Sequence, residues 1–67
     1  MDGVVETFDD VVGLGTVTAA DGTAYQFHCT QIADGSRTIA VGTAVTFDIE
    51  PGGPGRWEAT NVQRSGA

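Results

Sequence analysis

The stretch that decides the fold is LGTVTAADGTAYQFHC, residues 14–29. Its middle, residues 20–23, is the strongest turn signal in the chain, because Gly22 accepts positive φ and Asp21 tolerates it. Polar and apolar side chains alternate on both sides of this turn. The stretch therefore predicts a β-hairpin with one buried face.

The two strands of the hairpin, residues 14–19 and 24–29, each have a core side and a solvent side, because successive side chains of a strand point to opposite faces. The inward positions are Val17, Tyr25, Phe27 and Cys29, and the outward positions are Leu14, Thr16, Gln26 and His28.

Short alternating runs separated by turns continue through the rest of the 67 residues, which read as one domain. One run precedes the hairpin and two follow it, so we predict an all-β chain of five strands. So small a sheet is expected to close into a barrel, because closure removes unpaired strand edges. The other strands are expected over residues 4–8, 43–49 and 56–62, with an irregular link at 30–42, a loop at 51–55 and a frayed tail at 63–67.

The link and the fourth strand are expected to add apolar side chains to the core, and a short 3₁₀ turn is expected within the link. These side chains are Ile32, Ile39, Val41, Val45, Phe47 and Ile49.

The formal net charge is −6, and the three basic residues are all arginines. This balance opposes sequence-independent phosphate binding, where counterion release by Lys and Arg supplies most of the affinity. An acidic surface that keeps a small domain soluble is the plainer interpretation of the charge.

The chemistry-bearing residues are few. Cys29 is the single cysteine, so it forms no internal disulfide, and we expect a buried, inert thiol. With one histidine, no Ser/His/Asp or Cys/His constellation can be assembled. Glu6, Asp9 and Asp10 lack the loop spacing of a calcium site, so we predict neither an enzyme nor a cofactor. The chain shows no secretory signal and no apolar run of the roughly 20 residues that span a membrane, so a cytoplasmic location is expected.

Several segments in order resemble the bacterial cold-shock proteins, from about Gly3 to Val62. The segments that match are GVV at 3–5, FD at 8–9, GLGTV at 13–17, YQFHCTQI at 25–32, DG at 34–35, VTF at 45–47 and ATNV at 59–62. The resemblance implies an antiparallel OB-fold barrel that binds single-stranded RNA or DNA. In this family bases stack on aromatic rings of the first three strands, and such a platform needs no sequence preference because every base has a π-face.

Matched position by position, the chain keeps Phe8 and His28 of the family's binding residues. Elsewhere the resemblance implies that the aromatic positions are replaced by Thr7, Leu14, Thr16, Gln26, Cys29 and Ser36, and two lysine positions by Glu6 and Val12. Losing four or five rings at about 1 kcal/mol each costs roughly a thousandfold in affinity, so weak binding is predicted.

The candidate nucleic-acid-binding residues are Phe8, Leu14, Gln26, His28, Arg56 and Trp57. If the first strand is regular, Phe8 shares the outward face with Glu6, and it is either a stacking ring or a ring partly covered by its neighbours. Without a bulge, Trp57 points outward because its parity is opposite to that of Val62. Trp57 then contacts nucleic acid together with Arg56, caps a barrel end, or anchors a protein partner.

Two functions follow. The first is a cold-shock-like module that binds single-stranded nucleic acid weakly. The alternative is a protein-interaction or regulatory module that has lost this binding and takes a basic protein partner, as the acidic charge and Glu6 favour. The chain is expected to be a monomer, or a dimer formed by strand exchange through the link at 30–42.

Overall fold

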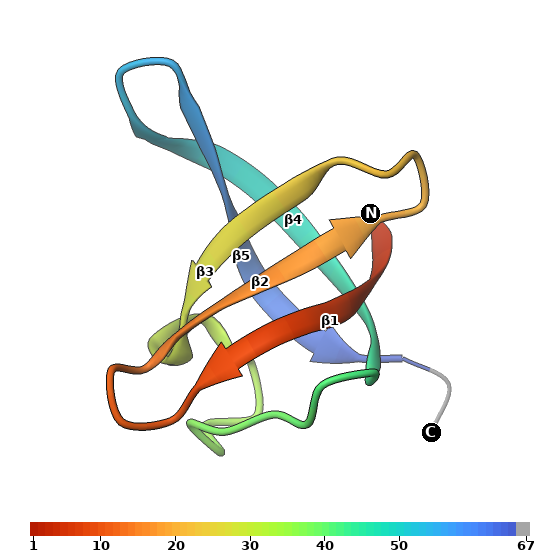
Figure 1. Ribbon diagram of the computed structural model, residues 1–67, viewed down its shortest axis with the longest axis vertical. Helices are drawn as coiled ribbons and strands as arrows, with labels where there is room; N and C mark the ends of the chain where they lie inside the picture. Colours follow the sequence, from red (N-terminus) through yellow and green to blue (C-terminus); the bar gives the residue numbers. More distant parts are fainter. Residues whose placement is uncertain (66–67) are drawn as a thin grey trace.

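The computed structural model describes residues 1–65 and contains five strands and one short 3₁₀ helix. The strands close into a barrel in the order β1-β2-β3-β5-β4 (Figure 1). Every strand pair is antiparallel except β3–β5, which is parallel and meets at one residue pair. The predicted all-β, five-stranded OB-fold barrel is confirmed. The elements are β1 (Asp2–Asp9), β2 (Leu14–Ala19), β3 (Ala24–His28), η1 (Cys29–Gln31), β4 (Ala44–Gly53) and β5 (Arg56–Arg64).

The hairpin that was predicted to decide the fold is present with its predicted turn. The Ala19 N–H donates to the Thr23 carbonyl at 2.8 Å, and the Thr23 N–H donates to Asp21 Oδ1 at 2.9 Å. Gly22 has φ of 90°, which is the conformation that favours glycine. Asp21 and Gly22 therefore fix the register of β2 on β3.

One apolar core fills the barrel. Gly15 is the cross-strand partner of Phe27, and the Phe27 ring covers the position that a side chain at Gly15 would occupy. The partly buried Tyr25 and Cys29 pack against this core, so the predicted burial of Cys29 is met only in part. The buried apolar residues are Val5, Val17, Ala19, Phe27, Ile32, Ile39, Val45, Phe47, Ala59 and Val62.

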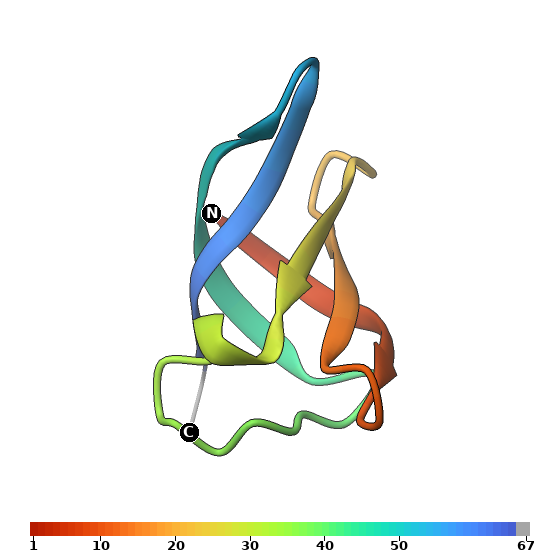
Figure 2. The ribbon, with the colours of Figure 1, turned by 90° about the vertical axis from the view of Figure 1, so that its left-hand side faces the viewer.

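Two boundary predictions and one core assignment are wrong. The predicted loop at 51–55 belongs in part to β4, which runs to Gly53 and pairs Pro51 with Trp57. Proline is tolerated there because β4 and β5 project beyond the barrel as a two-stranded hairpin (Figures 1 and 2). Val41 is 63% exposed and lies outside the core.

The predicted tail is also shorter than expected. Gln63 and Arg64 belong to β5, and the Ser65 N–H donates to the Ala44 carbonyl at 3.0 Å. The last two residues of that predicted tail lie outside the described residues.

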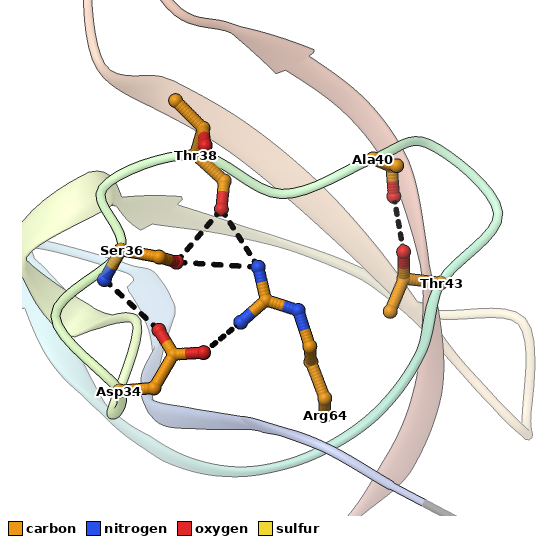
Figure 3. Close-up of polar contacts among 6 residues, drawn as sticks. All are labelled: Asp34, Ser36, Thr38, Ala40, Thr43 and Arg64. Atoms are coloured by element: carbon orange, nitrogen blue, oxygen red, sulfur yellow. Dashed lines mark hydrogen bonds and ion pairs between the residues drawn. The ribbon is translucent and has the colours of Figure 1, made fainter. Parts of the chain in front are cut away.

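The link between β3 and β4 is held by one arginine (Figure 3). Arg64 forms an ion pair with the Asp34 carboxylate and donates to Ser36 Oγ at 3.2 Å and to the Thr38 carbonyl at 2.9 Å. The Ser36 N–H in turn donates to Asp34 Oδ1 at 2.9 Å. We call these four residues the Arg64 knot. Hydrogen bonding by Ser36, from its side chain and then its backbone, lowers the pKa of Asp34, and the Arg64 charge lowers it further.

We predict that Gly15→Ala destabilises the barrel. A Cβ at this position would lie 2.6 Å from the Thr7 carbonyl oxygen and 2.8 Å from Phe27 Cζ, so backbone or core must shift. Overpacking of this kind costs about 1–3 kcal/mol of unfolding free energy, which urea denaturation measures. Gly53→Ala is the matched control, because a Cβ there meets nothing within 4 Å. Equal stability of the two variants would contradict this account.

A second prediction concerns pH. Because the pKa of Asp34 is lower in the folded chain, its contribution to stability is present above the unfolded pKa and is lost as pH falls through the folded pKa. A carbon-detected NMR titration should therefore give Asp34 a lower midpoint in the folded chain than in the urea-unfolded chain. Coincident midpoints would show that the Arg64 knot does not form in solution.

Candidate nucleic-acid interface

The outward side chains of β2 and β3 stand in rows across the sheet. Leu14 is the partner of His28, and Thr16 is the partner of Gln26. Gln26 and His28 are exposed, and Leu14 is half-buried. The structure therefore brings three of the predicted binding residues together on one face, which we call the outer face. Their binding role stays a prediction.

Phe8 does not lie on the outer face, because β1 contains a bulge. Val5 pairs with Val17 and Thr7 pairs with Thr16, so Glu6 is an extra residue on β1. An extra residue reverses the alternation of the residues that follow it. The prediction that Phe8 shares the face of Glu6 is therefore wrong. The ring of Phe8 is half-buried and stacks on Phe27, with 6.0 Å between ring centroids and 21° between planes.

Thr7 takes the outward position instead of Phe8. Its hydroxyl lies 2.8 Å from that of Thr16. Glu6 stays exposed, and its Oε2 accepts a hydrogen bond from Thr18 Oγ1 at 3.1 Å. The outer face thus presents two hydroxyls and a carboxylate where rings and a cation are implied by the resemblance.

The electrostatics of the outer face are acidic. Besides Glu6, β5 contributes the half-buried Glu58, which is the partner of Gln26 across the β3–β5 contact. Arg37 lies in the link and Arg64 at the end of β5, while Arg56 lies at the start of β5, two residues before Glu58. Phosphate groups passing over the outer face would meet the carboxylates of Glu6 and Glu58.

Arg56 and Trp57 lie on the projecting β4–β5 hairpin (Figure 2). Trp57 is 55% exposed, as predicted, but for a different reason. Thr46 pairs with Gln63 and Asp48 with Thr60, so β5 has one extra residue there, and Asn61 has φ of 51°.

The bulge at Asn61 puts Trp57 and Ala59 in phase with the buried Val62. Trp57 is exposed because the hairpin extends past the barrel. Its ring lies on the opposite side of the sheet from Glu58 and hence from the Gln26 row.

A groove of about 440 Å³ lies between the end of β1 and the link. Phe8 and Asp10 line one side, residues 38–41 line the other, and Arg64 contributes from the knot. No local pattern in the sequence indicates this groove, because its walls come from segments that are far apart in the chain and depend on the bulge in β1. Within residues 1–65 no group of three or more His, Cys, Asp or Glu side chains is placed to hold a metal ion. No helix in that part of the chain is long and apolar enough to cross a membrane.

Comparison of the sequence with known proteins points to one family. The sequence profile of the "Cold-shock" DNA-binding domain matches residues 1–65. Cold shock protein 2 of Lactiplantibacillus plantarum is 42% identical over 62 residues, which cover 91% of this chain and 92% of that protein. Glycine-rich protein 2 of Nicotiana sylvestris is 40% identical over 62 residues, which cover 90% of this chain but only 29% of that protein. The resemblance seen in the sequence is confirmed.

Proposed function

Because this chain belongs to the cold-shock domain family, we propose that it binds single-stranded nucleic acid, RNA or DNA, with low affinity. The observation that carries the proposal is the match to the family over residues 1–65, together with a bacterial relative matched over nearly its whole length. Fold alone would not support a function, but the match extends to the strands that bear the outer face.

The outer face offers bases three kinds of contact. His28 presents an exposed imidazole for stacking, and Leu14 beside it presents an apolar surface. The Gln26 amide can both donate to and accept from a base edge. Phe8 would contribute from the groove, and Arg56 with Trp57 from the hairpin.

The low affinity follows from what has replaced the rings. Each base–aromatic stack is worth about 1–3 kcal/mol, and four stacks at the lower value correspond to roughly a thousandfold in affinity. Hydroxyl and amide groups recover little of this, because their hydrogen bonds to a base replace hydrogen bonds to water. Glu6 adds repulsion of phosphate.

The acidic outer face favours a second candidate function, a protein-interaction module with a basic partner. Glu6 and Glu58 lie where a nucleic-acid backbone would pass, and the whole chain has a net charge of −6. A chain that ignores oligonucleotides and binds a basic protein would carry out this function instead. Whether it acts as a monomer or a strand-exchanged dimer is a matter for sizing chromatography.

We predict saturable binding of fluorescein-labelled oligo-dT and mixed-sequence RNA at low salt, measured by fluorescence anisotropy. His28→Ala should weaken binding by about 5- to 100-fold, which corresponds to one lost stack. Gln63→Ala, at an exposed position of β5, is the control and should bind like the unmodified chain. No binding at high micromolar concentrations would exclude the proposed function.

Reversing the charge of Glu6 should strengthen binding. Glu6→Lys removes a repulsion and adds a phosphate contact, so the dependence of log K on log salt should steepen by about 0.7 for a single strand. Asp48→Lys makes the same change in net charge at an exposed position of β4, and it should raise the affinity less than Glu6→Lys does. If both variants raise the affinity equally, net charge and not the outer face determines binding.

A further inference from the structure

The groove beside β1 has two walls of different origin. One wall is the ring of Phe8, which is supported from beneath by its stack on Phe27. The other is the irregular segment 38–41, which belongs to the link. The volume of about 440 Å³ lies within the range of small-ligand pockets and is large enough for one base.

The Arg64 knot holds one end of the second wall, at the Thr38 carbonyl. The other end is held by Thr43, whose N–H and hydroxyl donate to the Ala40 carbonyl at 3.2 and 2.7 Å (Figure 3). The backbone anchors the link at its two ends, where Ala33 N–H donates to the Val62 carbonyl and Gly42 N–H to the Val5 carbonyl, both at 2.8 Å. Between these ends Ile39 is buried in the core. In the described part of the chain, the hydrogen bonds that connect residues 34–38 to a strand all come from Arg64.

The charge of Arg64 is already compensated. Its guanidinium pairs with Asp34 and donates to the Ser36 hydroxyl and the Thr38 carbonyl. Three acceptors converge on one planar donor group, a geometry that the point charge of a lysine cannot reproduce. Arg64 is thus placed to fix a loop and not to attract a phosphate.

We propose that the groove takes one base of the bound strand against Phe8, and that Arg64 is a positioning residue that holds the Thr38 end of the opposite wall in place. This inference rests on the proposed function. A wall that is ordered before binding spares the ligand the cost of ordering it, so loosening the knot should weaken binding. The loss of affinity expected for Asp34→Asn is opposite to what charge alone predicts. Removing a carboxylate from an acidic chain would by itself strengthen the binding of nucleic acid.

The test is an anisotropy titration with labelled oligo-dT on three full-length variants. Arg64→Lys keeps the charge and Asp34→Asn removes a negative one, and both should weaken binding by roughly three- to tenfold with an unchanged salt dependence. Arg37→Lys is the matched control in the same link and should bind like the unmodified chain. Binding of Arg64→Lys at the unmodified level, or tighter binding by Asp34→Asn, would overturn the inference.

A double-mutant cycle separates positioning from general destabilisation. If Arg64 acts through the groove, Phe8→Leu should abolish the effect of Arg64→Lys on affinity. Additive losses in the cycle would instead assign Arg64 a purely structural role. Absence of binding by the unmodified chain would reject the proposed function itself. Binding whose affinity is the same in Arg64→Lys and Asp34→Asn as in the unmodified chain would reject this inference alone.

Discussion

The extra residue at Glu6 determines which side chains of β1 face solvent. By reversing the alternation after Val5, the bulge places Phe8 on Phe27 and turns Thr7 outward. The same reversal leaves one side of the Phe8 ring against the groove instead of on the outer face. The Phe8 ring is therefore found beside the link, and the outward position next to Thr16 is taken by the hydroxyl of Thr7.

This redistribution changes the physical basis of recognition. A ring accepts any base, since every base has a π-face, whereas hydroxyls and amides must match the donors and acceptors of a base edge. The outer face presents Thr7, Thr16 and Gln26 in one row, so a strand bound there would gain less from stacking and more from hydrogen bonds that distinguish base edges. A groove of one base's size beside Phe8 would then supply the stacking that the row lacks.

Local signals predicted much of the fold. Asp21 and Gly22 predict the hairpin, and the alternation of polar and apolar residues predicts which side chains of β2 and β3 point inward. Both predictions succeed because they depend only on residues that are close in sequence. A bulge leaves no mark in the alternation of polar and apolar residues. The sequence therefore predicts the wrong face for Phe8 and the wrong phase for Trp57. The pairing of Arg64 with Asp34 joins positions thirty residues apart, and only the closed barrel brings them together.

The few basic residues of this chain, and the use of one of them in the Arg64 knot, limit how it could bind a polyanion. Of the three arginines, Arg64 is committed to Asp34, and Arg56 lies on the hairpin, two residues before Glu58. Few counterions would be released on binding, so affinity must come from stacking and hydrogen bonding that salt screens little. For such a ligand, a binding site that is already ordered raises the affinity more than long-range electrostatic attraction does. An arginine that fixes a loop would then add more to the affinity than an arginine that contacts only solvent.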